Sequence, residues 1–521
     1  MTKTIKSALI SVFHKDGLDE ILPLLLQHNI TIYSTGGTQK LLENAGIKVH
    51  AVEDLTTYPS ILDGRVKTLH PKVFGGILSR REEDHLSQLR QYDIPEIDLV
   101  VVDLYPFEDT LAHTDDEATI IEKIDIGGIS LIRAAAKNYK DVVVIPSKSQ
   151  YEDLHKILAE QDGATSIADR KKLAMKAFQV SSHYDTCIFN YFNEDFADQD
   201  HLKVSIASRQ ELRYGENPHQ MASYYGDLSS EFDILGGKSL SYNNLVDIDS
   251  AVDIMREFDQ TDEITFAILK HTNTCGVATR GTLLEAYQAA LAGDPISAFG
   301  GILISNAPID LVTAQEIDKQ FYEVLIAPDF EEDALGLLRK KKNRRLLKRT
   351  AGLPPKVKIK TILGGIIAQD TDHKMEVSDD LEVVTKVKPS SSQIDQLLFA
   401  NKIVKHLKSN TIVLVKDHQL IGMGCGQTSR VDACKQAIDK AKRMGFTVEG
   451  AVMASDAFFP FPDCVEIAHG EGVSAVIQPG GSIKDNLSIE FCDAHEVAMV
   501  MTGVRHFKPV SYTHLTLPTK A

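Results

Sequence analysis

The sequence predicts an α/β protein whose first part is a doubly wound parallel sheet. Short apolar runs, typical of strands buried on both faces, alternate with amphipathic stretches of helical periodicity. The 521 residues suffice for about three compact units at roughly 150 residues per unit. Hydrophobic residues make up 43% and charged residues 25% of the chain, a composition typical of folded globular proteins.

The amino-terminal part alternates strand and helix patterns. An apolar run over 8–12 is followed by a loop and an amphipathic helix pattern over 18–27. The pattern repeats with a strand over 31–33, a glycine turn over 34–38 and a helix over 39–44. Strands joined by helices in this way lie parallel in one sheet.

Two further buried-type strands, 99–104 and 142–145, extend this sheet. We expect the first domain to occupy residues 1–192, where the alternation stops. The next segment, 193–203, is acidic and weakly patterned, and it is the predicted linker.

The second region, residues 204–508, is again α/β. Its strands include 266–269, 302–305 and 411–415, and its helices include 283–292 and 431–441. Two blocks divided near 369–393 predict two similar subdomains without a strict sequence repeat. Residues 509–521 do not fit a folded terminus and predict a non-native read-through tail, with a short disordered tail as the alternative.

Composition and charge exclude several classes of protein. Acidic residues outnumber basic ones by 73 to 56, and the net charge of −17 repels nucleic-acid backbones. No stretch approaches the ~18 apolar residues that span a bilayer, and no secretory cleavage pattern is present. We therefore expect neither a nucleic-acid partner nor a membrane partner.

The six cysteines form no CxxC pair and no dense framework, so neither a disulfide scaffold nor a zinc ribbon is predicted. A reducing, cytoplasmic location fits best, and no metal site is expected. A basic run over 339–349 holds eight Lys and Arg residues. A solvated helix face is the favoured interpretation of this run, and a polyanion site is the alternative.

The glycine turn at 34–38, with the sequence STGGT, is the first candidate binding motif. It lies between a strand and a helix, where free N–H groups and hydroxyls can surround a phosphate. The alternative is a tight connection without a ligand. The turn-rich loop 63–71 adds Arg65, Lys67 and His70, and this cluster of cations predicts an anion site.

Further along, Tyr105 follows the strand 99–104, at the end where doubly wound sheets bind ligands. The alternative is an aromatic residue that caps the core. Asp125 lies in a second glycine turn, before a helix predicted over 131–136. Lys137 ends that helix, where the helix dipole alone also favours a cation.

Together these residues resemble the cyclohydrolase domain of the AICAR transformylase/IMP cyclohydrolase (PurH) family, and the resemblance extends to about residue 508. It implies a methylglyoxal-synthase-like fold and closure of formyl-AICAR (FAICAR) to IMP with loss of water. Arg65 and Lys67 would bind and polarise the base and formamide, and Tyr105, Asp125 and Lys137 would assist closure. The implied phosphate ligands are Lys15, Ser34, Thr35, Gly36, Gly37 and Thr38.

The chain departs from this family at one edge of the site. Where the family commonly has SVSDK, this chain has SVFHK over residues 11–15. Lys15 is retained, but Phe13 and His14 replace a hydroxyl and a carboxylate. We therefore expect altered contacts at that edge.

A second group of polar motifs lies in the second region. The string LRYGENPHQ over 212–220 is too poor in apolar residues for a core element and predicts a binding loop. Lys270 and His271 follow the strand 266–269, where the neighbouring ammonium disfavours a charged imidazole and makes His271 a candidate neutral base. The alternative is a strand-end histidine exposed to water.

These strings, with SAFGG (297–301), KSN (408–410) and GQTSR (426–430), resemble the transformylase domain of the same family. The resemblance implies two cytidine-deaminase-like subdomains without zinc, no catalytic metal, and a homodimer. It also implies formyl transfer from N10-formyltetrahydrofolate, the co-substrate, to the exocyclic amine of AICAR.

Three catalytic residues are implied for this transfer. His271 would take the amine proton, Lys270 would tune it and assist the leaving nitrogen, and Asn410 would stabilise the oxyanion or orient the amine. The implied substrate-binding residues are Arg213, Tyr214, His219, Phe299, Gly300, Gln427, Arg430, Phe461 and Asp463.

Two other functions compete with this hypothesis. A zinc nucleobase deaminase requires a His/Cys-x-Glu segment and a PCxxC segment, and neither occurs in the sequence. A non-enzymatic scaffold built on the basic run would bind a polyanion without turnover.

Overall fold

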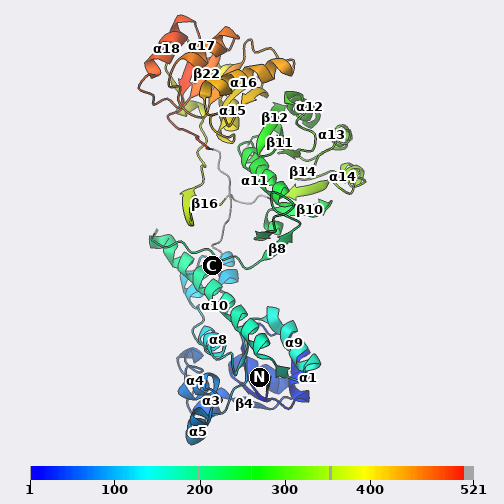
Figure 1. The fold of residues 1–521 in the computed structure, drawn as a ribbon, viewed down its shortest axis with the longest axis vertical. Coiled ribbons are helices and arrows are strands. Elements are labelled where there is room, and N and C mark those ends of the chain that lie inside the picture. Colours follow the sequence, from blue (N-terminus) through cyan, green and yellow to red (C-terminus); the bar gives the residue numbers. More distant parts are fainter. Residues whose placement is uncertain (1, 197–199, 260, 351–354, 510–521) are drawn as a thin grey trace. The chain divides into compact units, whose positions relative to one another are not determined.

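The computed structural model describes residues 2–196, 200–259, 261–350 and 355–509 (Figure 1). The chain divides into two compact units, residues 1–207 and 208–521. Within the described ranges, no helix has the length and apolar character needed to cross a membrane. All of the predicted tail except Pro509 lies outside the described residues.

The first unit is built on a five-stranded parallel sheet with the order β4-β3-β2-β5-β6. Its strands are β2 (Ser7–Val12), β3 (Thr31–Ser34), β4 (Val49–Ala51), β5 (Leu99–Asp103) and β6 (Val143–Ile145). The chain order of the strands reverses between β2 and β5. In sheets of this kind, ligands bind outside the carboxyl ends of the strands at that point.

Ten helices in the described part of the first unit connect and cover these strands. They are α1 (Leu18–Gln27), α2 (Gly36–Asn44), α3 (Val52–Thr56), α4 (Pro71–Leu78), α5 (Glu83–Gln91), α6 (Phe107–His113), α7 (Glu117–Ile121), α8 (Gly127–Lys137), α9 (Tyr151–Glu160) and α10 (Ile167–Phe196). A short strand pair, β1 (Lys3–Thr4) with β7 (Ala164–Thr165), joins the two ends of this unit.

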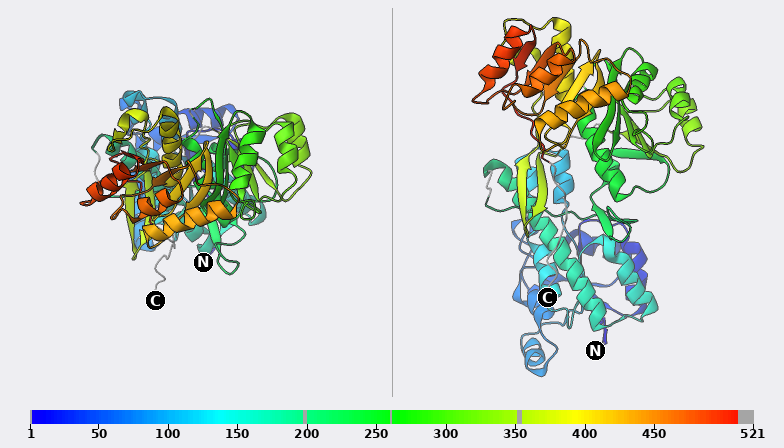
Figure 2. Two further views of the ribbon diagram at one scale, coloured as in Figure 1. Left: turned by 90° about the horizontal axis from the view of Figure 1, so that it is seen from above. Right: turned by 45° about the horizontal axis from the view of Figure 1, so that its top comes forward.

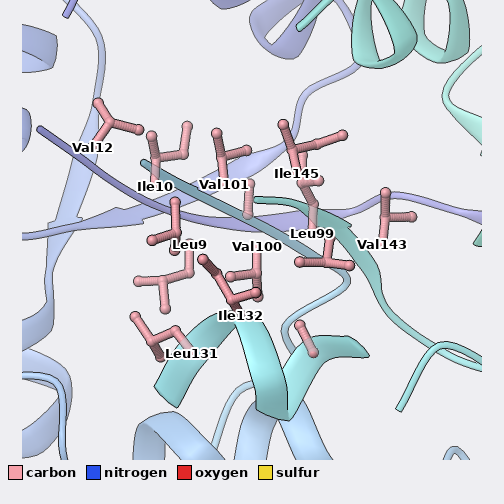
Figure 3. Packing of buried hydrophobic residues seen from close by; sticks show 14 of the residues in the cluster. Leu9, Ile10, Val12, Leu99, Val100, Val101, Leu131, Ile132, Val143 and Ile145 are labelled. Carbon is pink, nitrogen blue, oxygen red and sulfur yellow. The ribbon is translucent and has the colours of Figure 1, made fainter. Parts of the chain in front are cut away.

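The core of the first unit is the sheet with its covering helices. Figure 3 shows Leu131 and Ile132 of α8 beneath the sheet, on the side to which Leu9 and Val100 point. Each of these four side chains is at most 1% exposed. Burying one aliphatic side chain of this size contributes about 1.5–3 kcal/mol, so this packing fixes α8 against β2 and β5.

The second unit holds a twelve-stranded mixed sheet (Figure 2). In spatial order its strands are β10 (Phe232–Gly236), β15 (Arg345–Arg349), β14 (Val324–Ala327), β13 (Ile302–Ser305), β11 (Ile264–Lys270), β12 (Asn273–Arg280), β20 (Gln419–Gly424), β19 (Ile412–Lys416), β21 (Val452–Ser455), β22 (Ala475–Gln478), β23 (Ala498–Met501) and β18 (Glu382–Val383).

Two separate hairpins and eight described helices complete this unit. The hairpins are β8 (Arg209–Leu212) with β9 (Ala222–Tyr225), and β16 (Val357–Ile362) with β17 (Gly365–Asp370). The helices are α11 (Tyr242–Arg256), α12 (Leu283–Gly293), α13 (Leu311–Ile317), α14 (Glu332–Leu338), α15 (Ser391–Lys405), α16 (Arg430–Arg443), α17 (Asp463–Gly470) and α18 (Asp485–Ala494).

The large sheet consists of two halves with the same topology, the first half from β10 to β15 in the chain and the second from β18 to β23. In each half a hairpin, β11–β12 or β19–β20, pairs with a third strand, which continues through two parallel strands to an antiparallel edge strand. Helices α11 and α15 each span 15 residues and begin with a capping box. The halves join where β12 pairs with β20.

The α/β prediction is confirmed, and several elements agree residue for residue, including the helix 18–27 and the strand 302–305. The helix α10 continues through Phe196, so it includes the first residues of the segment expected to be the linker, 193–203. The boundary between the compact units follows Ala207. The exact domain limits and the division near 369–393 stay predictions.

The prediction of a helix face for the basic run 339–349 is wrong. The helix α14 ends at Leu338, and the run continues through a turn into the interior strand β15. Arg345 is buried and its Nη1 lies 2.6 Å from Glu323 Oε2, while Arg344 pairs with Asp318. These carboxylates are distant in sequence, so local composition gave no sign that they neutralise the run.

Candidate active sites

Two lysine side chains meet at the switch point of the first unit. Lys15, which follows β2, donates from Nζ to Thr38 Oγ1 at 3.0 Å and to the Val12 carbonyl. Burial lowers the pKa of Lys15, nearby Asp103 raises it, and the ammonium of Lys67 lowers it again. The two ammonium groups are therefore close enough to repel each other, and an anion between them would relieve that repulsion.

The amino terminus of α2 completes an anion site. Gly36 has a φ of +56°, which favours glycine, and a Cβ there would lie 2.7 Å from Lys67 Nζ, so a side chain at this position would displace the ammonium. The Thr35 hydroxyl donates to Glu53 Oε1 at 2.9 Å and does not cap the helix. Within the described chain, the N–H groups of residues 36–38 have no acceptor. Two lysines at an uncapped helix amino terminus form a site suited to phosphate.

Three sequence-predicted residues of this region have other surroundings. Ser34 is fully buried in β3 and donates to the Ile10 carbonyl at 2.7 Å, which makes it part of the core. The position of Gly37 faces open space. His70 caps α4 by accepting a hydrogen bond from the Lys72 N–H at 3.2 Å. The glycine turn is shorter than predicted, because α2 already begins at Gly36.

Tyr105 and Asp125 lie together beside this site. The Asp125 carboxylate accepts hydrogen bonds from the N–H groups of Gly128, at 2.6 Å, and Tyr105. Burial raises the pKa of Asp125, and these two hydrogen bonds lower it in part. Burial and the charges of Asp125 and Glu122 raise the pKa of the Tyr105 phenol. The pair therefore combines a carboxylate and a phenol whose pKa values are both raised, chiefly by burial.

Arg65 is joined to this pair through Glu122. Arg65 forms an ion pair with Glu122, and Glu122 also acts on the Tyr105 hydroxyl. The ring of Phe13, at the position where the chain departs from the family, packs edge-on against Tyr105 with centroids 5.3 Å apart. Lys123 Nζ lies 5.7 Å from the Tyr105 ring centroid. The edge at Phe13 is thus aromatic and cationic.

The structure does not bring Lys137 to this group within one chain. Lys137 is the last residue of α8, and Asp125 lies just before its first residue, Gly127. At 1.5 Å per residue, the two ends of this helix are about 15 Å apart. Within the described residues the exposed Lys137 side chain has no ion pair, which agrees with the alternative of a cation favoured by the helix dipole.

In the second unit, Lys270 holds the SAFGG turn. Its Nζ donates to the Phe299 carbonyl at 2.8 Å. Phe299 is 59% exposed, and the centroid of its ring lies 5.5 Å from that of Phe321. The backbone carbonyl of Phe321 accepts a hydrogen bond from the Gly300 N–H at 2.9 Å. Lys270, Phe299 and Gly300 therefore lie close together.

His271 is at the tip of the β11–β12 hairpin. Both tip residues, His271 and Thr272, have positive φ angles of 52° and 61°. The Thr272 N–H donates to Asp247 Oδ1 of α11 at 2.8 Å. Burial raises the pKa of Asp247, and the hydrogen bond from Thr272 and the charge of His271 lower it. Asp247, which the sequence analysis missed, thus fixes the loop that presents an exposed imidazole.

The half-buried Asn410 and the buried Arg430 belong to one polar network. The Asn410 amide Nδ2 donates to the carbonyls of Gln427 at 2.9 Å and Thr428 at 3.2 Å, and its Oδ1 accepts from Arg430 Nη2 at 2.8 Å. Arg430 also pairs with Asp456, which is 1% exposed. Both amide hydrogens of Asn410 therefore have acceptors inside the chain.

Four of the predicted residues share one cavity of about 430 Å³. Asn410, Arg430, Phe461 and Asp463 line it, together with Arg505, which the sequence analysis missed. Lys484 Nζ lies 4.2 Å from the Phe461 ring centroid. Among the described side chains, no carboxylate pairs with Arg505, whereas Arg430 is neutralised by Asp456.

The hairpin tip and this cavity lie at the same edge of the sheet. Strands β11, β12, β20 and β19 are adjacent and successively antiparallel, so β11 ends where β19 begins. At that edge Cys425 Sγ donates to Asn273 Oδ1 at 3.5 Å, and the Gln427 amide donates to the Cys425 carbonyl at 3.1 Å. Three spacings of about 4.8 Å separate β11 from β19 by about 14 Å.

The LRYGENPHQ loop follows β8 and is exposed. The Arg213 guanidinium lies 5.4 Å from the Tyr214 ring centroid, and His219 is exposed. The Asn243 amide of α11 donates to the Glu216 carbonyl at 3.2 Å, which ties the loop to the helix that carries Asp247.

Comparisons with known proteins identify the family of the chain. The family described as AICARFT/IMPCHase bienzyme matches residues 135–440, and the MGS-like domain matches residues 17–130. The bifunctional purine biosynthesis protein PurH of Bacteroides thetaiotaomicron is 57% identical over 97% of this chain and 99% of its own length. The PurH protein of Acetivibrio thermocellus is 47% identical over 97% of this chain and 100% of its own length.

Proposed function

Because the chain belongs to the AICARFT/IMPCHase bienzyme family, we propose that the two groups of residues described above divide its two reactions between them. The protein is a bifunctional enzyme of purine biosynthesis, an AICAR transformylase and IMP cyclohydrolase that uses N10-formyltetrahydrofolate. The assignment of each reaction to particular side chains is supported by the geometry of each unit.

The first unit closes the FAICAR ring. In this step the carboxamide nitrogen attacks the formyl carbon, a C–N bond forms, and the formyl oxygen leaves as water. Lys15, Lys67 and the uncapped N–H groups of α2 hold the ribotide phosphate. The position of Lys67 next to Gly36 supports this role for Lys67 in place of the contact with the base and formamide that the family resemblance implies. Fixing the phosphate places the two reacting groups, and positioning of this kind supplies much of the rate.

The chemistry of this closure is carried out by Tyr105, Asp125 and Arg65. Tyr105, whose raised pKa keeps the phenol protonated, donates a proton to the departing oxygen. Burial raises the pKa of Asp125, which makes its carboxylate a stronger base for the proton of the attacking nitrogen. Arg65, held by Glu122, is placed to polarise the formyl oxygen. Lys137 is left out of this group because it lies at the far end of α8.

The lysine pair at α2 carries this proposal, and Lys67→Ala tests it. Loss of the ammonium removes half of the charge that balances the phosphate, so we expect cyclisation of supplied FAICAR to fall about 100-fold. Formyl transfer to AICAR should change less than twofold. Lys40→Ala, an exposed lysine on the same helix, is the matched control. Normal cyclisation by the Lys67 variant would contradict the assignment.

The second unit transfers the formyl group. The AICAR amine nitrogen attacks the formyl carbon, the bond from that carbon to N10 breaks, and the proton lost by the amine passes to N10. His271 accepts the amine proton, and Lys270 stands next to it at the end of β11. The common edge of His271 and the 430 Å³ cavity supports one site that holds both ligands.

The structure favours positioning roles for Asn410 and Arg430. Their hydrogen-bonding groups are used by each other, by the 427–428 carbonyls and by Asp456. Arg505 is the cation better placed to bind an anionic ligand in this cavity, where Phe461 and Asp463 offer a ring face and a carboxylate to the pterin. The exposed Arg213 and His219, with the half-buried Tyr214, then cover the ligands from the LRYGENPHQ loop.

We propose that the enzyme is a homodimer that uses the β16–β17 hairpin. This hairpin does not join the large sheet, and two-stranded hairpins alone are marginally stable. Lys358 on one face pairs with Asp253 of the same unit at 2.6 Å. The opposite face, with Val357, Ile359 and Ile366, remains exposed and apolar. Such a patch is typical of a protein–protein interface.

Sedimentation analysis tests the dimer. The wild-type chain should sediment as a dimer, and the double variant Ile359→Glu with Ile366→Glu as a monomer. A monomeric wild type, or a dimer that survives both charges, would refute this interface. We also propose that the enzyme is cytoplasmic and binds no nucleic acid, which its six free thiols and its net charge of −17 support.

A further inference from the structure

A cluster of three metal-ligating side chains lies outside both proposed active sites. Glu108 comes from α6, and His183 and Cys187 come from α10. Their ligand atoms all lie within 4.8 Å of one another. His183 Nε2 is the central atom, 3.0 Å from Glu108 Oε2 and 3.9 Å from Cys187 Sγ.

The distances fit a tetrahedral ion. With metal–ligand bonds of about 2.0–2.3 Å, neighbouring ligand atoms of such an ion lie about 3.3–3.8 Å apart. The two separations from His183 Nε2 bracket that range, and the third, between the Glu108 carboxylate and Cys187 Sγ, is at most 4.8 Å. Side-chain rotations of about 1 Å therefore place the three atoms around one ion. His183 and Cys187 are four residues apart on a helix and so lie on the same face.

The second nitrogen of the imidazole is already engaged. His183 Nδ1 lies 2.8 Å from Ser205 Oγ, in the segment that follows α10. Donation from Nδ1 to this hydroxyl leaves Nε2 with its lone pair directed at the other two ligands. Histidines that ligate metals have such a partner on their second nitrogen.

We propose that Glu108, His183 and Cys187 bind a divalent ion of borderline softness, zinc, in a site with an open fourth position. One thiolate, one imidazole and one carboxylate are ligands that zinc accepts together. The ion replaces the proton of the Cys187 thiol and any proton shared by His183 and Glu108, and these protons pass to solvent. No electron transfer is involved.

This ion would stabilise the positions of two residues in the proposed cyclohydrolase site. Glu108 lies three residues after Tyr105, and the Phe107 N–H donates to the Tyr105 carbonyl at 2.9 Å. On α10, Tyr184 follows His183 and its hydroxyl accepts from the Asp125 N–H at 2.9 Å. A metal that joins α6 to α10 therefore fixes the two elements that position Tyr105 and Asp125.

Cobalt and zinc titrations of the chelator-treated full chain test this proposal. One equivalent of Co²⁺ should produce tetrahedral d–d bands and a thiolate charge-transfer band. Zinc should abolish these bands and raise the thermal midpoint of the first unit by about 5 °C. The bands and the shift should be lost in Cys187→Ser and His183→Gln and retained in His155→Gln, an exposed histidine on α9.

A second measurement needs no variant. Zinc should slow the alkylation of Cys187 in the native wild-type chain at least 10-fold, as followed by mass spectrometry of its peptide. Failure to bind one equivalent at 10 µM metal, or binding that survives both ligand substitutions, would overturn the proposal. Unchanged alkylation of Cys187 in the presence of bound zinc would overturn it as well.

Discussion

The two halves of the large sheet have the same frame but carry different chemical groups. At the end of β11, Lys270 Nζ donates to a carbonyl three residues before β13. At the end of β19, Lys416 Nζ donates in the same way to the Glu449 carbonyl, three residues before β21. The lysine–carbonyl contact therefore belongs to the duplicated frame, and it does not by itself mark a catalytic residue.

The hairpin tips correspond as well. Asp417 and His418 have positive φ angles of 50° and 53°, like the tip residues of the first half. Gln396 and Asp247 each lie five residues after the first residue of their helix, and each accepts an N–H of its hairpin tip. The difference is chemical, because the first half pairs a carboxylate with the tip that carries His271.

At the opposite ends of these strands, the charged side chain belongs to the second half and the neutral one to the first half. Thr265 and Thr411 each donate an N–H to the side chain that follows the third strand, which is Asn306 in the first half and Asp456 in the second. Only Asp456 is charged, and it neutralises Arg430 beside the cavity. Each half thus has its distinctive charged groups at one end of its hairpin. Because the strands are antiparallel, these two ends lie at the same edge of the large sheet.

The largest expected effect separates the two hairpin tips. His271→Ala should lower formyl transfer by about 10²–10⁴, the usual contribution of a general base. His418→Ala, which removes the histidine of the second tip at the position that corresponds to Thr272, should leave transfer within twofold. Assays with AICAR and the formyl donor, and with supplied FAICAR to confirm intact cyclisation, measure both. Equal losses in the two variants would show that the tips act only through folding.

Much of this frame could be predicted from local sequence, but the contacts between its parts could not. The strands 266–269 and 411–415 were predicted because a buried strand needs a continuous apolar run. Asp247 gave no signal, because its role depends on a hairpin tip 25 residues away in the chain. Arg505 was missed for the same reason, since it reaches the cavity from the carboxyl-terminal end of the described chain.

A smaller effect is expected on the stability of the second half of the large sheet. His506 lies between Asp372 and Glu376; burial lowers its pKa, but hydrogen bonds to both carboxylates raise it to about 9. Its charged form therefore stabilises the fold fully below the unfolded value of ~6.5, and this contribution is lost as the pH rises through 9. It is worth about 3 kcal/mol at pH 6.

Thermal unfolding at two pH values measures this contribution. At pH 6, His506→Gln should lower the midpoint of the second unit by about 5 °C, and at pH 10 by less than 2 °C. His495→Gln, an exposed histidine on the same half, should shift neither midpoint by more than 1 °C. A pH-independent loss in the His506 variant would mean that hydrogen bonding, not charge, accounts for its stability.

The smallest expected effect tests the carboxylate that distinguishes the two tips. Asp247→Asn keeps an acceptor for the Thr272 N–H, as the Gln396 amide does in the second half, but removes the negative charge near His271. That charge favours the imidazolium formed when His271 takes the amine proton, so kcat for transfer should fall about 3–10-fold with little change in KM. Gln396→Glu, which gives the second tip the charge it lacks, should change neither quantity. A loss in Asp247→Asn that falls on KM as much as on kcat would reduce Asp247 to a purely structural support of the hairpin.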